Sequence, residues 1–182
     1  MKRVVWITGV PGSGKSTVGD RLTAAMREEF SSPCAIVDAN VIRRQFWPHL
    51  GLNPEDRTTN VNRLAELAGV FVRAGNHVVV ACIAPDRQVR NRALGLIRVA
   101  APEVAVHQVH LTAPIDTLKA GDKEGLYSAQ AEGRLQGLTG VDAPYEPPSH
   151  DEALCLDTSK LSVDECVPKI LDFIQRVPPR EW

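Results

Sequence analysis

The nine residues of the segment GVPGSGKST, numbers 9–17, constrain this chain more than any other stretch. They satisfy the pattern GxxxxGK[ST], and they lie between the apolar run RVVWITG and an amphipathic stretch. A glycine-rich turn between a strand and a helix points backbone N–H groups at phosphate oxygens, the lysine reaches the terminal phosphates, and the hydroxyl after it ligates Mg²⁺. The pattern therefore predicts a nucleoside triphosphate site rather than an ordinary glycine-rich turn. Its predicted contacts are Gly9, Pro11, Gly12, Ser13, Gly14, Lys15, Ser16 and Thr17, with Ser16 on the metal.

Short apolar runs alternate with amphipathic stretches along the rest of the chain. This alternation predicts an α/β fold in which a parallel sheet carries helices on both faces. The helix boundaries support it, because Asn53 and Pro54 form a start signal, Gly75 is a stop signal, and Ser162 with Glu165 forms a capping box. The predicted strands are 3–9, 34–38, 77–84, 104–111 and 153–157, and the predicted helices are 15–30, 54–74, 86–100 and 162–175.

Composition and charge exclude several classes of protein. A chain of 182 residues with 43% apolar content can bury one core, so we expect a single domain over residues 1–182. The formal charge of −1 offers no general attraction to nucleic acid or anionic lipid, and no aromatic-basic patch is evident. The first apolar run is too short for a signal peptide, and no run is long enough to span a membrane. We therefore expect a cytoplasmic protein with a small-molecule partner, and no nucleic-acid or membrane partner.

Polar residues behind the second predicted strand extend the site. Asp38 ends that strand, at the sheet edge where such folds collect ligands, and could orient or deprotonate an attacking hydroxyl. It could equally cap a following helix, and the two roles are compatible. Arg43, Arg57 and Asn60 follow closely, and Arg57 and Asn60 share one helix face. These side chains suit an anionic acceptor, although a solvated helix face is the alternative for each arginine alone.

One long stretch, from about residue 120 to residue 151, shows no such pattern. It begins GDKEGLYSAQAEGRLQGLTG, which is rich in glycine and too irregular for a buried helix or strand. A loop of this length in a compact domain is usually functional or disordered.

Taken together, these segments resemble the adenylyl-sulfate kinases, which transfer phosphate from ATP to the 3′-hydroxyl of adenosine 5′-phosphosulfate. VDANVIR is similar to a DGDNVR-like string, and LGLNPEDRTTNVNR is similar to LGFSxEDRxENxRR. CIAP with DRQVRNRA resembles the ISPYRxxRDxAR region, and EGLYSAQAEGRLQGLTGVDAPYEPP resembles KGLYxxAxxGxxxxFTGxDxPYExP. The resemblance covers nearly the whole chain without gaps in these strings.

The resemblance implies a three-layer P-loop kinase fold with a five-stranded parallel sheet flanked by helices and a mobile lid over about residues 120–150. It implies ATP and Mg²⁺ as cofactors, a homodimer, and Asp38 and Lys15 as catalytic residues. Glycines would let such a lid fold over both reactants and exclude water. The implied acceptor contacts are Asn40, Arg43, Leu52, Arg57, Asn60, Ile83, Glu124 and Leu138.

The chain departs from the family pattern mainly on the acceptor side. Two phenylalanines that resemble an adenine sandwich are Leu52 and Leu138 here, and the serine of ISP is Ala84. In the lid, an arginine is replaced by Gly121 and a lysine by Glu124, which would repel a dianionic acceptor. The second carboxylate of DGDN is also lost, as Asn40, whereas every position of the nucleotide pattern is intact.

Three functions remain open from the sequence. The first is an ATP-dependent phosphotransferase of this family that acts on a hydroxyl of a small molecule other than adenylyl sulfate. The second is an authentic adenylyl-sulfate kinase that makes the activated sulfate donor for sulfate assimilation. The third is a nucleotide-binding regulatory protein, or pseudo-kinase, against which the carboxylate of Asp38 counts because a pure binder would not need it.

Overall fold

A central sheet of five parallel strands organises the molecule. The computed structural model describes residues 1–176. The strands lie in the order β2-β3-β1-β4-β5, and every neighbouring pair is parallel. This confirms the predicted α/β fold with five parallel strands. The strands are β1 (Arg3–Thr8), β2 (Cys34–Asp38), β3 (His77–Ala81), β4 (Ala105–Thr112) and β5 (Leu154–Asp157).

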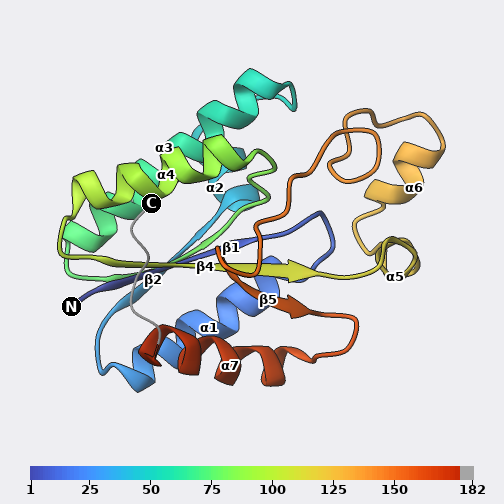
Figure 1. Ribbon diagram of the computed structural model, residues 1–182. Coiled ribbons are helices and arrows are strands. Elements are labelled where there is room, and N and C mark those ends of the chain that lie inside the picture. The colour runs from blue at the N-terminus through green and yellow to red at the C-terminus, as the bar shows by residue number, and fades with distance from the viewer. Residues whose placement is uncertain (177–182) are drawn as a thin grey trace.

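Helices cover both faces of the sheet and make a three-layer molecule (Figure 1). Alternate residues of β1 feed the two cores, because successive strand side chains point to opposite faces. Trp6 packs with Leu64 and Leu94 on one face, and Ile7 packs with Leu22 and Ile170 on the other. The first face carries α2 (Ala39–Phe46), α3 (Pro54–Arg73) and α4 (Arg87–Ala100), and the second carries α1 (Lys15–Glu29) and α7 (Val163–Arg176).

The ends of the helices follow the expected capping chemistry with one exception. The side chain of Asn53 accepts a hydrogen bond from the backbone N–H of Asp56 at 2.8 Å, and Gly75 has a φ of 87° just after α3. Before α7, the Ser162 backbone N–H donates to the Glu165 carboxylate at 2.8 Å. The Ser162 hydroxyl also donates to that carboxylate, so only half of the predicted reciprocal capping box is present.

The third strand ends earlier than the sequence suggests. β3 stops at Ala81, whereas the apolar run continues to residue 84. Ala84 has a left-handed φ of 40°, which no residue of a straight strand adopts. The chain therefore turns sharply where it leaves the sheet.

The unpatterned stretch contains one helix that the sequence analysis did not expect. The helix α5 (Ile115–Ala120) precedes it, and α6 (Leu126–Ala131) lies within it. Both lie beyond the carboxyl ends of the strands, apart from the two main helical layers (Figure 1). The helix α6 is short, and Tyr127 is its one buried residue, 5% exposed and packed with Leu118 and Leu138. Its stability comes from tertiary contacts, which apolar periodicity over six residues cannot reveal.

None of the helices in residues 1–176 is both long enough and apolar enough to cross a membrane.

Candidate active site

The loop between β1 and α1 has the shape of an anion cradle. Gly12 and Gly14 have left-handed φ values of 77° and 86°. At Gly9, a Cβ atom would lie 2.3 Å from the carbonyl oxygen of Leu111, so only glycine fits there. Gly14 then leads into the N-terminus of α1, which presents unpaired N–H groups and a positive dipole end. The predicted phosphate site is thus formed by local backbone geometry.

Lys15 folds its side chain back over this loop. Its ammonium donates a hydrogen bond to the carbonyl oxygen of Val10 at 2.8 Å. Burial lowers the pKa of Lys15 to about 8, while Cys82, Asp38 and Glu124 act to raise it. A cation held this way meets a phosphate with little loss of hydration, since burial has already removed much of its water.

Asp38 combines the two roles that the sequence left open. Its Oδ1 atom accepts from the backbone N–H groups of Asn40 at 2.9 Å and Val41 at 3.2 Å, and so caps α2. Its Oδ2 atom accepts from the hydroxyl of Ser16 at 2.5 Å. One carboxylate thus joins the second strand, the second helix and the nucleotide loop. Ser16 and Asp38 also present the hard oxygen ligands that Mg²⁺ prefers, so the residues fit that ion.

A cavity of about 320 Å³ opens beside this pair. Three carboxylates line it, from Asp20 on α1, from Asp38, and from Glu124 on the segment between α5 and α6. The other lining residues are Ser16, Ile36, Asn40, Val41, Ile42 and Arg44. The structure thus brings Glu124 to the same cavity as Ser16, Asp38 and Asn40. Sequence analysis missed Asp20, and no signal short of its position on α1 would have found it.

Arg57 lies where two distant segments meet, rather than pointing freely at solvent. Its Nε atom donates to the carbonyl of Leu52 at 2.5 Å, and its two terminal nitrogens donate to the carbonyl of Gly137 and the hydroxyl of Thr139. Burial lowers the pKa of Arg57, the charge of Arg43 lowers it further, and Asp142 opposes the shift. The two predicted acceptor-binding arginines therefore lie near one another, and one of them holds the lid segment.

The remaining predicted acceptor residues occupy different environments. Asn60 accepts a hydrogen bond from the indole N–H of Trp47 at 2.7 Å, which fixes its side chain. Leu52 is 43% exposed, whereas Leu138 is 5% exposed and belongs to the small apolar cluster with Tyr127. The two leucines therefore differ in exposure and do not present two matching apolar surfaces to a ligand. Ile83 is half-buried, and its carbonyl accepts the hydroxyl of Thr8.

The segment predicted as a lid, residues 120–150, contacts the nucleotide loop through Tyr127, which sequence analysis did not single out. Its hydroxyl donates to the carbonyl of Pro11 at 2.7 Å, and a Cβ atom at Gly12 would lie 3.7 Å from its ring. At Gly140, a Cβ atom would lie 2.8 Å from the Val10 side chain. The segment quoted as similar to KGLY contains this tyrosine, so the signal was present in the sequence.

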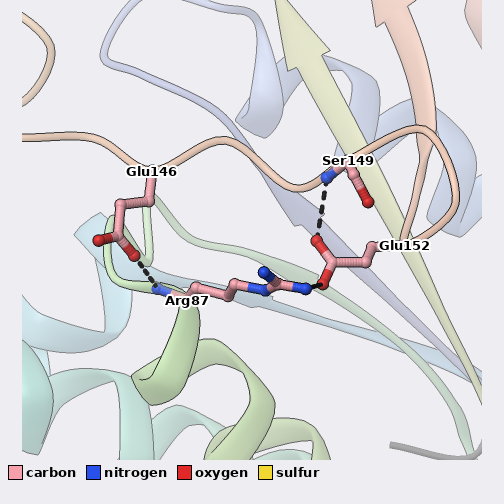
Figure 2. A network of polar contacts seen from close by, with 4 residues as sticks. All are labelled: Arg87, Glu146, Ser149 and Glu152. Carbon is pink, nitrogen blue, oxygen red and sulfur yellow. Dashed lines mark hydrogen bonds and ion pairs between the residues drawn. The ribbon is translucent and has the colours of Figure 1, made fainter.

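The chain after the lid is fastened to the start of α4. We call residues 145–152 the stem. Figure 2 shows Glu146 accepting from the backbone N–H of Arg87 at 3.0 Å, while the Arg87 guanidinium pairs with Glu152. Glu152 in turn accepts from the backbone N–H of Ser149 at 2.9 Å. The predicted lid boundary near residue 150 therefore includes a stretch that is bonded to the body of the domain.

Comparison with known proteins finds relatives over nearly the whole chain. Residues 1–156 match the family model described as adenylylsulphate kinase. The adenylyl-sulfate kinase of Marinobacter nauticus is 35% identical over 94% of this chain and 83% of its own length. That of Chloroflexus aurantiacus is 35% identical over 96% of this chain and 89% of its own. A Mycobacterium tuberculosis APS kinase, solved in complex with AMPPNP and APS, aligns with a TM-score of 0.88 at 28% identity, over 96% of this chain and 98% of that one.

Proposed function

This chain belongs to the adenylylsulphate kinase family. We propose that it transfers the γ-phosphate of ATP to a hydroxyl of a small molecule other than adenylyl sulfate. The family establishes an ATP-dependent kinase that uses Mg²⁺. The finer statement concerns the acceptor. It rests on one observation, the carboxylate of Glu124 on the cavity that also contains Asp38.

The proposed division of labour follows from the contacts at the nucleotide loop. The backbone of residues 9–17 and Lys15 hold the ATP phosphates, as the left-handed glycines and the enclosed ammonium suit them to do. The hydroxyl of Ser16 would hold Mg²⁺, which would supply positive charge to neutralise the transferred phosphoryl group. Because Oδ1 of Asp38 is committed to capping α2, Oδ2 is the atom that orients the acceptor hydroxyl and takes its proton.

Electrostatics of the cavity favour an acceptor that is not dianionic. Asp20, Asp38 and Glu124 place three negative charges around it, against the positive charges of Arg44 and the nearby Lys15. Two unit charges about 4 Å apart interact by about 4 kcal/mol at an effective dielectric constant near 20, so one carboxylate in place of a lysine changes the preferred acceptor. A smaller alcohol that is neutral or carries a cation opposite Glu124 fits this arrangement.

The second candidate is an authentic adenylyl-sulfate kinase. Two observations favour it: the curated relatives named above carry that activity in their names, and Arg43 and Arg57 still lie together near the lid. A paired cation site suits a phosphosulfate group. On this alternative, Lys119 or Lys123 would offset Glu124 from positions displaced along the lid.

A coupled assay of ADP release with adenylyl sulfate separates the two candidates. We expect slow turnover that needs millimolar adenylyl sulfate, and faster turnover with an alcohol found by screening neutral and cationic alcohols with Mg-ATP. Efficient turnover at micromolar adenylyl sulfate would overturn the changed acceptor and establish the second candidate. A protein that binds Mg-ATP but phosphorylates no acceptor would support the regulatory pseudo-kinase instead. A homodimer and a cytoplasmic location stay predictions, and size-exclusion chromatography with light scattering tests the first.

A further inference from the structure

The turn that follows β3, residues 83–85, is held by three separate parts of the chain. The carbonyl of Ile83 accepts the hydroxyl of Thr8, at the end of β1. The next carbonyl, of Ala84, accepts from the guanidinium of Arg90 on α4 at 2.9 Å, and the third, of Pro85, accepts from the backbone N–H of Glu146 in the stem at 2.9 Å. Three successive carbonyls are thus bonded to β1, α4 and the stem.

This turn adopts a backbone conformation that needs such support. Ala84 has a φ of 40° and is only 1% exposed. A residue with a Cβ atom in the left-handed region is disfavoured, and such a conformation persists only where its surroundings determine it. The three bonds supply that constraint, so losing one should loosen the turn.

The turn lies beside the reacting groups. Asp38 pairs with Ala81 in the register between β2 and β3, and the next residue, Cys82, experiences the charges of Lys15 and Asp38. Ile83 directly follows Cys82, which lies close to Lys15 and Asp38. A shift of this turn would therefore act beside Asp38, the group assigned to the acceptor hydroxyl.

The hydrogen bonds at Thr8 form a chain with a defined direction. The Thr8 hydroxyl has one hydrogen, which it donates to the carbonyl of Ile83. The hydroxyl of Tyr145 lies 3.3 Å from the same Thr8 oxygen, so Tyr145 must be the donor in that contact. The chain runs from Tyr145 through Thr8 to Ile83, and its contact between Thr8 and Tyr145 spans 137 residues of sequence.

Arg90 holds the next carbonyl of the turn, that of Ala84. It is 1% exposed, and among residues 1–176 its Nε and Nη2 atoms have no hydrogen-bond partner. Burial lowers the pKa of Arg90, against the effects of Tyr145, Glu152 and Glu146. A buried cation with few partners is costly, and the Nη1 atom of Arg90 donates to the carbonyl of the left-handed Ala84.

We propose that Tyr145 is a positioning residue for the acceptor, which acts through Thr8 to set the Ile83 carbonyl and the turn that follows it. The proposal rests on the proposed kinase function, because it takes Asp38, which lies next to the end of β3, as the group that receives the acceptor hydroxyl. The stem does not depend on Tyr145 for its attachment, since Glu146 and Glu152 bind it to Arg87 separately (Figure 2). Removing the Tyr145 hydroxyl should therefore disturb the turn and leave the stem in place.

The test uses Tyr145→Phe and Thr8→Val, which each remove a hydroxyl with little change of shape, their double variant, and Glu152→Gln as the matched control in the stem. Hydrogen exchange of the peptide covering residues 80–86, which excludes Arg87, is measured with Mg-ADP bound. We expect exchange to rise about five- to tenfold in Tyr145→Phe and Thr8→Val, as the loss of one buried hydrogen bond predicts. The double variant should match Thr8→Val alone, because both changes break one chain. Glu152→Gln should leave this peptide unchanged.

Initial rates with adenylyl sulfate as the probe acceptor give the functional arm. In Tyr145→Phe we expect the KM for adenylyl sulfate to rise about fivefold while the KM for ATP stays the same, and in Glu152→Gln neither should change. Unchanged exchange in Tyr145→Phe, multiplying effects in the double variant, or an equal rise of KM in Glu152→Gln would each overturn the proposal. A wild-type protein that never uses adenylyl sulfate would bear on the acceptor alone, and the exchange measurements would still decide whether Tyr145 positions the turn.

Discussion

The nucleotide loop and the acceptor side of this site are built in different ways. The loop of residues 9–17 is formed by neighbours in sequence, with glycines at left-handed positions and a helix that begins at Lys15. The acceptor side is assembled from far apart, because Arg57 binds Gly137 across 80 residues and Tyr127 binds Pro11 across 116. A local structure leaves its mark in a short pattern, whereas a long-range one does not.

The two regions also differ in the amino-acid substitutions that they can tolerate. In the loop, glycines occupy left-handed backbone conformations or, at Gly9, a position where a Cβ atom would clash. Few substitutions there are therefore compatible with phosphate binding. The acceptor side depends on side-chain charge and on docking of the lid, which single substitutions can alter without loss of the fold. Divergence of the acceptor within an unchanged kinase is therefore physically easy, and the following experiments test where the boundary lies.

The largest effect should come from Asp38→Asn, at the point where the two regions meet. The amide keeps an oxygen to cap α2 but can no longer accept a proton at the position of Oδ2. We expect kcat to fall by about 10³-fold or more, while the Kd for an ATP analogue changes less than about threefold. Steady-state kinetics and calorimetry measure the two quantities. Asp20→Asn, a carboxylate on the same cavity, is the control and should retain most of its turnover. Retained turnover in Asp38→Asn would remove the assigned base.

The fold and the nucleotide site could be predicted because they depend on local signals. The βα alternation indicated all five strands, and GxxxxGK[ST] placed the phosphate loop between β1 and α1. The same alternation indicated helices on both faces of the sheet, whereas the strand order was not predicted. Sequence analysis fell short where tertiary contacts decide the structure, as in α6, which Tyr127 anchors, and at the end of β3, where Ala84 turns the chain.

The acceptor side was predictable only in part. The resemblance pointed to Arg57 and Leu138, but not to the bonds of Arg57 with the lid or to the burial of Leu138 in its own apolar cluster. Glu124 was identified as a departure, yet its place on the cavity with Asp38 depends on how the lid folds back. Contacts of this kind carry no period or motif, since each needs two segments that only the fold brings together.

A smaller effect is expected from Glu124→Lys, which tests whether charge on the lid sets the acceptor. Restoring a cation there should raise kcat/KM for adenylyl sulfate by about 10- to 100-fold, because an attraction replaces a repulsion near the dianion. The gain should shrink at high salt, since Glu124 is exposed. Glu132→Lys makes the same charge change in the lid at a residue outside the cavity lining, and should give little gain. Equal gains in both variants would show that general lid charge matters rather than the position of residue 124.

Docking of the lid on the nucleotide loop can be tested with a pair of glycines. Gly140 and Gly133 both have left-handed φ values, 86° and 73°, so alanine costs about 1 kcal/mol at each. Only at Gly140 would the new Cβ meet another group, Val10 in the loop, at 2.8 Å. We expect Gly140→Ala to speed tryptic cleavage in the lid several-fold, with Mg-ATP analogue bound, relative to Gly133→Ala. Identical cleavage rates would mean that the lid does not rest on Val10.

The smallest effect near neutral pH should come from the sheet that supports both regions. Burial is the largest influence that lowers the pKa of His77, His107 and His110 to about 4 each, with nearby positive charges adding to it. Their ordinary value in an unfolded chain is about 6.5, so between pH 6.5 and 4 the unfolded state binds more protons. The free energy of unfolding should therefore be constant above about pH 7 and fall as the pH drops through this window. Denaturant unfolding from pH 7.5 to 5 measures the slope.

His77→Asn separates one contribution to this slope. His77 Nδ1 accepts the backbone N–H of Arg3 at 3.0 Å, a bond that needs the nitrogen unprotonated and that the amide oxygen of asparagine can replace. In the variant, the pH dependence of the free energy of unfolding should decrease by the equivalent of up to about one bound proton. If the free energy of unfolding of His77→Asn depends on pH as steeply as that of the wild type, protonation of His77 does not contribute to the loss of stability in acid, and the buried His107 and His110 become the groups to test.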